Sequence, residues 1–406
     1  MADILLKTQT ISSLAWKVFE RSGNALIQLV VQIVMARLIA PEQFGALAIM
    51  LVFVNVGNVI VQSGLNTALV RAPYADDDDF TTVFWMSLAI SLILLLLVFA
   101  ISPIVAAYYN MPDLEWPLRI LSLLLVINAF NSVQIARVSR DLEFRKVFFA
   151  TLASVIMSGF AGVAAAMLGW GLWALVIQQL MNRAVNCVAL SFQVSWKPSF
   201  VFRIDRAYEL FSFGWKLLAS GLIEVGYQSL SDLIIGKQFS TAQLGFVSQG
   251  KHYPQALGSM LDGAIQPVML SAVAHVQNDL PSVKRLVRRA LKTSTYLIMP
   301  CMTLFALVAE PVVRLLLGEQ WLPCVFFLQV YCFTNALLPI HTSNLQALNA
   351  MGHSDLFLKL EIIKKSYGIV FLLVTAFVFH DVYLMVGSLL RLASSPLLSM
   401  RIQISD

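Results

Sequence analysis

The sequence predicts an all-α polytopic membrane protein with about twelve transmembrane helices, and three observations lead to that fold class. No charged residue occurs between Asp79 and Asp113, and none occurs between Lys146 and Arg183. Hydrophobic residues make up 58% of the 406 residues, charged residues make up 13%, and the mean hydropathy is +0.77. The polar connectors are short. Because about 20 apolar residues in a helix cross a bilayer core, each uncharged segment is long enough to span at least once.

The predicted spans form two sets of six. The longest polar break near the centre, residues 195–209, is expected to be a cytoplasmic linker between an N-terminal lobe (1–194) and a C-terminal lobe (210–406). Gly169 and Gly171 are expected to form a helical hairpin turn. Hydropathy places the spans at residues 13–38, 45–69, 81–108, 117–138, 147–168, 172–193, 210–236, 243–271, 290–316, 322–344, 358–379 and 382–401.

Cations alternate in abundance between successive connectors. Lysine and arginine near the ends of membrane helices resist translocation, so the cation-rich connectors are expected in the cytoplasm, together with both termini. The opposite connectors hold chiefly Arg37, Arg119 and Lys237, which are expected to be interfacial anchors or helix caps. The inner cations are Arg71, Arg137, Arg140, Arg145, Lys146, Lys197, Arg203, Arg206, Lys284, Arg285, Arg288, Arg289, Lys292, Lys359, Lys364 and Lys365.

Four adjacent aspartates, residues 76–79, follow Arg71 in one inner connector. Such a run favours a solvated loop whose like charges repel one another. The alternative interpretation is a site for a divalent cation.

A ten-residue pattern occurs twice, 200 residues apart. Residues 36–45 read ARLIAPEQFG and residues 236–245 read GKQFSTAQLG, so a small residue, a cation, Gln and Gly recur in the same order. Pro41 and Thr241 both suit the first residue of a helix. An even number of crossings separates the copies, so both point the same way. We therefore expect a parallel repeat of two six-helix lobes related by a pseudo-two-fold axis, an architecture typical of alternating-access transporters.

The same residues carry a resemblance to a known family. Residues 36–45 and 64–69 resemble the first-loop signature and second-helix end of polysaccharide transporters. Further segments that look like the family's motifs are residues 212–214, 232–237, 244–245, 309–311 and 316–321. The resemblance covers almost the whole chain and is to Wzx-type flippases of the multidrug/oligosaccharidyl-lipid/polysaccharide exporter superfamily. Many relatives have more helices than the twelve predicted here, so the chain is either a shorter member or a truncated product.

The resemblance implies a transporter of the bacterial inner membrane that is not an enzyme. Such proteins move undecaprenyl-pyrophosphate-linked oligosaccharide repeat units from the cytoplasmic to the periplasmic leaflet, for lipopolysaccharide or exopolysaccharide biosynthesis. The expected partners are this lipid-linked oligosaccharide, membrane lipids, and the polymerase and chain-length proteins of the same pathway. No nucleic acid and no cofactor are expected.

Charged residues inside predicted spans are the candidates for a substrate site, because each costs about 2.5–3.5 kcal/mol at the bilayer centre and usually faces a cavity. The cations expected to bind the pyrophosphate are Arg183, Lys216 and Lys251. Structural pairing with Glu224 or Asp262 is the alternative for the two lysines. Amides on polar faces of the first two helices are expected to meet sugar hydroxyls: Gln28, Gln32, Asn55, Asn58 and Gln62.

Energy coupling is left open between two mechanisms. Glu224, Asp232 and Asp262 are candidates for carrying H⁺ or Na⁺ inward. The membrane potential alone is the alternative, because it contributes about 2.3 kcal/mol per charge per 100 mV. The sequence contains no GxxxxGK[ST] motif, which argues against ATP drive by this chain.

Two other functions compete with the flippase. A multidrug or small-cation antiporter of the same superfamily is expected to have a cleft dominated by carboxylates and aromatics. A polytopic glycosyltransferase or polymerase needs a sizeable site outside the membrane, with positioned carboxylates or a metal. The histidines here are scattered without metal-ligand spacing, and no metal site is expected.

Overall fold

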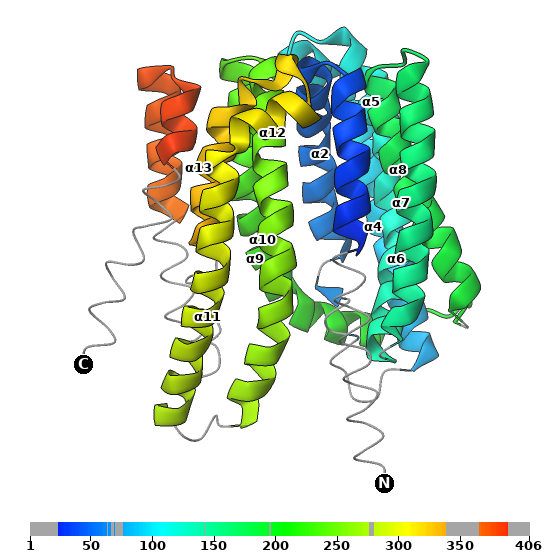
Figure 1. The fold of residues 1–406 in the computed structure, drawn as a ribbon. Coiled ribbons are helices and arrows are strands. Elements are labelled where there is room, and N and C mark those ends of the chain that lie inside the picture. Colours follow the sequence, from blue (N-terminus) through cyan, green and yellow to red (C-terminus); the bar gives the residue numbers. More distant parts are fainter. Residues whose placement is uncertain are drawn as a thin grey trace. The chain divides into compact units, whose positions relative to one another are not determined.

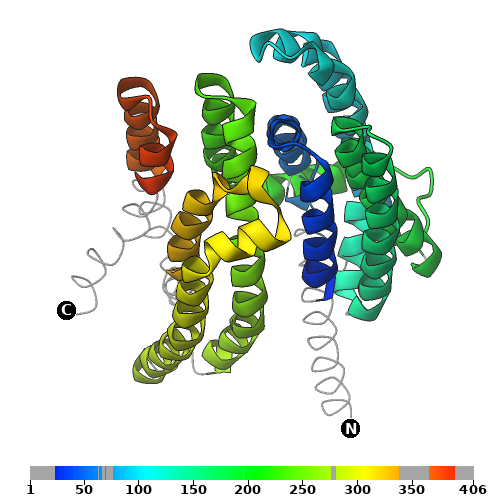
Figure 2. The ribbon, with the colours of Figure 1, turned by 45° about the horizontal axis from the view of Figure 1, so that its top comes forward.

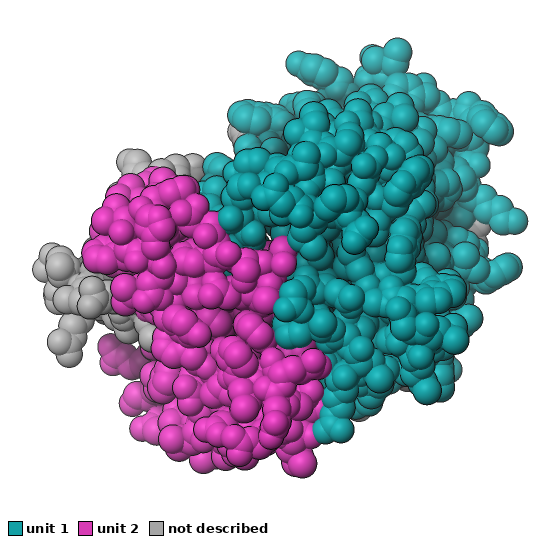
Figure 3. Space-filling model, turned by 90° about the horizontal axis from the view of Figure 1, so that it is seen from above, with its two compact units in different colours: residues 1–237 teal, residues 238–406 magenta. Residues whose placement is uncertain are grey.

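Every regular element in the described part of the computed structural model is helical, which confirms the all-α class (Figure 1). The chain divides into two compact units, residues 1–237 (unit 1) and 238–406 (unit 2), coloured separately in Figure 3. The structure describes residues 23–62, 64–65, 69, 76–141, 143–194, 196–275, 280–337 and 365–388. Unit 1 includes most of α9 (Ile204–Gln238), which starts within the predicted linker, residues 195–209.

Within these ranges, four helical segments are long and apolar enough to cross a membrane. They are Pro41–Gln62, Asp77–Tyr108, Pro112–Arg140 and Phe144–Met167. A fifth span results if the bent pair Lys292–Leu307 and Ala309–Leu316 counts as one. By length and composition the protein is therefore a multi-pass membrane protein, while the full count of twelve stays a prediction.

Helix breaks recur where the sequence pattern recurs. The first described helix, Gly23–Leu38, ends just before α2 (Pro41–Gln62). Likewise α9 ends at Gln238 and α10 (Thr241–His275) begins three residues later. Pro41 and Thr241 are thus the first residues of their helices, as the sequence predicted. The two copies share the same local helix–break–helix structure.

The next elements of unit 1 form one long span and one broken span. The long span is α4 (Asp77–Tyr108). A 3₁₀ turn, Pro112–Leu114, then leads into α5 (Glu115–Leu121) and α6 (Leu123–Arg140). The span predicted at 117–138 is therefore not a single continuous helix.

Arg119 donates a hydrogen bond to a carbonyl of α4 that lacks its helical donor. Pro103 has no N–H, so the carbonyl of Phe99 loses its helical donor. Ser102 Oγ donates to that oxygen at 3.0 Å and Arg119 Nε donates to it at 3.3 Å. Arg119 also pairs with Glu115 at 2.8 Å. This cation stabilises a proline-interrupted turn, since an unsatisfied carbonyl is costly in a membrane.

The helices α7 (Phe144–Met167) and α8 (Leu172–Gln193) form the predicted hairpin and run side by side in Figures 1 and 2. Gly169 (φ 80°) and Gly171 (φ 52°) make its turn in a backbone region that favours glycine. Polar contacts hold the pair together. Asn182 Nδ2 donates to Ser158 Oγ and Asn186 Nδ2 donates to Thr151 Oγ1, both at 3.2 Å.

Unit 2 is built on α10, α11 (Leu280–Leu307) and α13 (Cys324–Ala336), which pack against one another. Gly250 permits the closest approach, because a Cβ there would lie 2.7 Å from Phe327 Cβ. A short helix, α12 (Ala309–Leu316), follows α11 at an angle of 64°. The described part of the unit also includes helix Lys365–Phe379, whose last turn Thr375–Phe379 is π-helical, and the helical residues 382–388.

Two predicted spans contain helix breaks. The span at 290–316 bends at Val308, which hydropathy could not indicate because it reports apolar content and carries no information on direction. In the span at 45–69, α2 stops at Gln62 and Gly64 adopts φ 69°. By contrast, the span at 172–193 coincides with α8.

Candidate functional site

Three of the predicted sugar-binding amides lie together on α2. Asn55, Asn58 and Gln62 are spaced by three and four residues, which puts them on one face of the helix. Asn55 and Gln62 are exposed, and Asn58 Oδ1 accepts a hydrogen bond from Asn128 Nδ2 of α6 at 2.9 Å. The structure therefore adds Asn128 to this polar face. No sequence signal pointed to it, because it lies 70 residues away.

Two glycines, Gly64 just after α2 and Gly221 in α9, allow α9 to approach the polar end of α2. A Cβ on Gly64 would lie 2.6 Å from the carbonyl oxygen of Gly214, and a Cβ on Gly221 would lie 3.0 Å from Val59 Cγ1. Glu224 follows Gly221 by three residues, so both lie on the same side of α9. Its carboxylate is exposed and accepts a hydrogen bond from Gln228 Nε2 at 2.8 Å. Unit 1 thus carries amides and one carboxylate where α2 and α9 meet.

The other two predicted amides belong to helix Gly23–Leu38. Gln28 is half-buried, whereas Gln32 is 7% exposed and its Oε1 accepts no hydrogen bond within the described ranges. Gln178 of α8 is also buried, and its Oε1 likewise has no partner there. A buried amide oxygen without a donor is unfavourable by roughly 1–3 kcal/mol. These two oxygens are suited to accept hydrogen bonds from hydroxyl groups.

The remaining candidates are less closely grouped. Arg183 is exposed on α8, Asp232 is half-buried on α9, and Lys251 is half-buried on α10. Lys216 and Asp262 lie in α9 and α10, but their side chains fall outside the described part of the structure. The assignments to pyrophosphate and to ion coupling therefore stay predictions.

Lys237 is a helix cap, as predicted, but it lies near the end of α9 and caps the C-terminus of α4. Its Nζ donates to the carbonyl of Tyr108, the last residue of α4, and lies 4.3 Å from the centre of the Tyr108 ring. A cation at a helix C-terminus is favourable because the carbonyls there lack donors. Tyr109 OH also donates to the Leu233 carbonyl at 3.2 Å, so this end of α4 is joined to α9.

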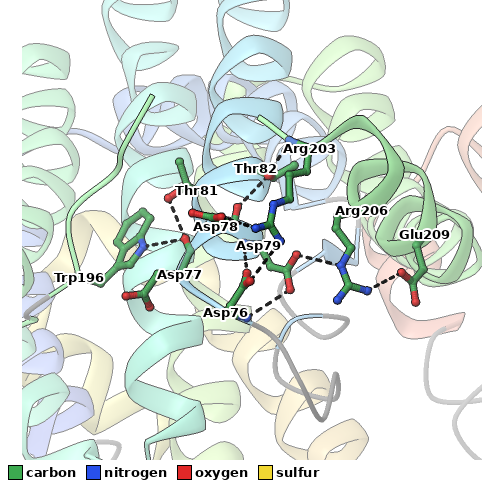
Figure 4. Close-up of polar contacts among 10 residues, drawn as sticks. All are labelled: Asp76, Asp77, Asp78, Asp79, Thr81, Thr82, Trp196, Arg203, Arg206 and Glu209. Carbon is green, nitrogen blue, oxygen red and sulfur yellow. Dashed lines mark hydrogen bonds and ion pairs between the residues drawn. The ribbon is translucent and has the colours of Figure 1, made fainter. Parts of the chain in front are cut away.

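The aspartate run is not the solvated loop that the sequence predicted. Asp76 is the N-cap of α4: its Oδ1 accepts from Asp79 N at 2.9 Å, and Asp79 Oδ2 accepts from Asp76 N at 3.2 Å (Figure 4). This reciprocal capping box satisfies two N–H groups at the helix start. Asp79 is only 3% exposed. The signal for it was present in the spacing Asp-x-x-Asp before an apolar run.

Arginines distant in sequence neutralise the run, as Figure 4 shows for two of them. Arg203 pairs with Asp76 at 3.1 Å and with Asp78 at 2.5 Å, and Arg206 Nε lies 3.4 Å from Asp79 Oδ1. Asp77 pairs with a third arginine, Arg137 of α6, at 2.8 Å. We call these four aspartates with Arg137, Arg203 and Arg206 the cap cluster. It fastens three segments of unit 1 together.

The connector before α9 is fixed to the same place. Trp85 Nε1 donates to the carbonyl of Ser199 at 2.9 Å, and Trp196 Nε1 donates to that of Asp77 at 3.4 Å. The Trp196 ring lies 6.0 Å from the Phe84 ring, beside a small apolar core. The predicted linker is therefore docked on α4 in unit 1 instead of being a free tether.

The electrostatics of the cap cluster are those of an ion-pair network. The hydrogen bond from the Asp79 backbone lowers the pKa of Asp76, and the nearby Arg203 lowers it further, against a smaller opposing effect of burial. Within the described ranges no group of three or more His, Cys, Asp or Glu side chains is arranged to hold a metal ion. The carboxylates of the run are turned toward arginines, as expected for a structural role.

These features define the class of protein: an all-helical, multi-pass membrane protein with proline-interrupted helices and polar faces inside its spans. The solved structures that share this fold include two transport proteins. The lipid II flippase MurJ, in an inward closed conformation, aligns with 96% of this chain and 85% of its own, with a TM-score of 0.73 and 13% identity. An inward-facing multidrug-resistance MATE transporter aligns with 96% of this chain and 98% of its own, with a TM-score of 0.71 and 14% identity.

The chain belongs to a family described as "Polysaccharide biosynthesis protein", whose model matches residues 34–326. It is 26% identical over 310 residues to the succinoglycan biosynthesis transport protein ExoT of Rhizobium meliloti, covering 76% of this chain and 63% of ExoT. It is 22% identical over 362 residues to the lipopolysaccharide biosynthesis protein WzxC of Escherichia coli, covering 88% of this chain and 73% of WzxC. The chain thus spans about two thirds of the length of these relatives. The resemblance inferred from the sequence is confirmed.

Proposed function

We propose that the protein is a flippase that moves polyprenyl-pyrophosphate-linked oligosaccharides from the cytoplasmic to the periplasmic leaflet of a bacterial inner membrane. The observation that carries this proposal is membership of the polysaccharide biosynthesis family, together with a relative named as a transport protein. The fold shared with a lipid II flippase supports a lipid-linked cargo. A transporter of this kind performs no covalent chemistry, so the protein is not an enzyme.

The proposed architecture has twelve helices in two six-helix lobes, with both termini in the cytoplasm. The recurrence of the helix break at Pro41 and Thr241 supports a parallel repeat. Two such lobes allow alternating access, in which a central site opens first to one side of the membrane and then to the other.

Within this mechanism the amides of unit 1 would serve the sugar. The exposed Asn55 and Gln62 beside Asn58 offer donors and acceptors on one face of α2. Sugar hydroxyls can donate to such oxygens and accept from such amide groups. The amides are therefore suited to a hydroxyl-rich chain of varied composition.

The charged candidates would serve the anion and its transport. Arg183, Lys216 and Lys251 are proposed to replace water around the pyrophosphate, since charge-assisted hydrogen bonds are the strongest available to it. Glu224, Asp232 and Asp262 are proposed to carry H⁺ or Na⁺ if transport is coupled. Glu224 is the best placed of these, because it lies on the side of α9 that approaches α2.

The decisive experiment is to delete the gene and identify the accumulated polyprenyl-linked sugars by mass spectrometry, with their leaflet determined. Complete repeat units stranded on the cytoplasmic face are the expected result. Incomplete units would indicate a glycosyltransferase instead, and complete unpolymerised units facing outward would indicate a polymerase. Complementation with Lys251→Glu is expected to leave membrane abundance unchanged and to abolish export.

The fold shared with a MATE transporter supports one second candidate, a multidrug antiporter. The exposed carboxylate of Glu224 is the group that a cationic drug would bind in that case. Loss of the gene would then raise drug susceptibility and leave the lipid-linked sugars unchanged. That outcome would overturn the flippase proposal.

A further inference from the structure

Four exposed cations follow one side of the first half of α11. Arg285, Arg288, Arg289 and Lys292 are spaced by three, one and three residues, which places them within one helical face. We call them the basic stripe. At 1.5 Å per residue the stripe extends about 10 Å along the helix. Its last residue, Lys292, begins the segment Lys292–Leu307, which together with Ala309–Leu316 is long and apolar enough to cross a membrane.

The basic stripe lies on the outward side of unit 2. The opposite face of α11 is buried, with Ser294 1% exposed and Ile298 0% exposed. Tyr296 lies eleven residues after Arg285, and Leu307 lies eleven residues after Tyr296, so both are on the same face of the helix as the cations. Tyr296 is 80% exposed and Leu307 is 73% exposed. The cations therefore share their face with apolar side chains that suit contact with lipid.

No carboxylate neutralises the basic stripe within the described ranges. With the carboxylates of the described residues none of the four side chains forms an ion pair, whereas Arg137, Arg203 and Arg206 of unit 1 are all paired with aspartates. Four cations on one helical face repel one another unless an anion is bound. The stripe consequently has charge available for an external partner.

We propose that the basic stripe binds the headgroup phosphates of anionic phospholipids in the leaflet at that end of α11. The chemistry fits because Arg and Lys side chains form charge-assisted hydrogen bonds to phosphate oxygens, while Tyr296 and the apolar residues after it contact the acyl chains. Basic clusters next to a membrane helix attract anionic lipid surfaces in this way. This site is separate from the substrate site and does not depend on the proposed transport function.

The shape of the stripe favours phospholipids over a pyrophosphate lipid. A pyrophosphate is compact and needs cations that converge on it. The stripe instead spreads its cations along a convex helix surface, where each can meet a different monoanionic headgroup. Several phosphatidylglycerol molecules in a row therefore fit the arrangement better than one pyrophosphate.

The test uses the full-length protein purified in a neutral detergent. Binding of phosphatidylglycerol and of phosphatidylcholine is measured by native mass spectrometry, for the unmodified protein and for the variant R285Q/R288Q/R289Q/K292Q. A charge-preserving variant, R285K/R288K/R289K/K292R, is the matched control. We expect phosphatidylglycerol to bind more tightly than phosphatidylcholine, to weaken at least about tenfold in the glutamine variant, and to be retained in the control.

Two further measurements test the proposal: the salt dependence of phospholipid binding and the binding of undecaprenyl pyrophosphate. Should the glutamine variant not fold, raising the salt concentration with the unmodified protein must weaken phosphatidylglycerol binding and leave phosphatidylcholine binding unchanged. Equal binding of both phospholipids would overturn the proposal. Preferential binding of undecaprenyl pyrophosphate, with loss in the glutamine variant, would also overturn it and would assign the stripe to the transported lipid.

Discussion

The cap cluster of unit 1 and the basic stripe of unit 2 use arginine in opposite ways. In the cap cluster, Arg203 and Arg206 are joined to aspartates that start α4, and the contacts hold the connector before α9 against that helix. In the basic stripe, Arg285 and Arg289 are exposed and have no carboxylate partner within the described ranges. One group stabilises the protein internally, and the other has charge available outside it.

The difference shows what a count of cations leaves out. Both groups come from connectors that are rich in Lys and Arg, so both support the same membrane orientation. Only the structure reveals that residues 76–79 neutralise Arg203 and Arg206 from more than a hundred positions away. Pairing, and not the number of cations, decides which of these surfaces attracts anions.

The largest expected effect is at Asp79, whose side chain both caps α4 and faces Arg206 from a buried position. Asp79→Ala should lower the free energy of unfolding by about 1–2 kcal/mol, since it removes the acceptor of the Asp76 N–H in the capping box and one of the two carboxylates that pair with Arg206. Thermal unfolding in detergent measures this. Asp78→Ala is the matched control, because Asp78 is more exposed and should cost less than about 1 kcal/mol. If both variants lost the same free energy of unfolding, the buried position of Asp79 would add nothing to the stability of the protein.

A smaller effect is expected at Arg203, which pairs with Asp76 and Asp78 at a half-exposed position. Arg203→Gln should cost about 1 kcal/mol and should release the connector from α4. Hydrogen exchange of residues 196–203 should then become faster. Lys197→Gln provides the control, because Lys197 is exposed and makes no ion pair in the described structure. Unchanged exchange in Arg203→Gln would mean that Trp196 and Ser199 suffice to hold the connector.

Acidification should weaken the cap cluster and leave the basic stripe unaffected. The pKa of Asp76 is lowered from 3.8 in the folded protein, so its stabilising contribution is complete above about pH 4 and is lost as the pH falls through the folded pKa. Asp76→Asn keeps an N-cap side chain but cannot titrate. Its thermal stability should therefore fall less steeply below pH 4 than that of the unmodified protein. If thermal stability fell equally steeply with pH in both proteins, Asp76 would not contribute to the pH dependence of stability.

The sequence predicted most of unit 1 and only the general character of unit 2. Span 172–193 was correct because Gly171 and the end of the apolar run mark both ends of α8. The bend of 64° at Val308 could not be predicted, since hydropathy does not record direction. The helix starts at Pro41 and Thr241 were predictable because both residues suit the first turn of a helix.

The candidate site was predictable in composition and not in connectivity. Helical spacing put Asn55, Asn58 and Gln62 on one face, but the bond from Asn128 to Asn58 depends on how α6 packs against α2. The aspartate run was interpreted as a loop because its charge outweighed its capping pattern. Its arginine partners are distant in sequence, and such pairs cannot be found without the fold.

The smallest expected effect is the change in the protein's stability when the basic stripe is neutralised. The variant R285Q/R288Q/R289Q/K292Q should unfold within about 0.5 kcal/mol of the unmodified protein in neutral detergent, because exposed side chains without partners contribute little to folding. Relief of repulsion among the four cations should make any change slightly stabilising. In membranes rich in phosphatidylglycerol the same variant should lose the stabilisation that bound lipid gives to the folded state. A large loss in neutral detergent would instead show that the stripe, like the cap cluster, is part of the internal structure of its unit.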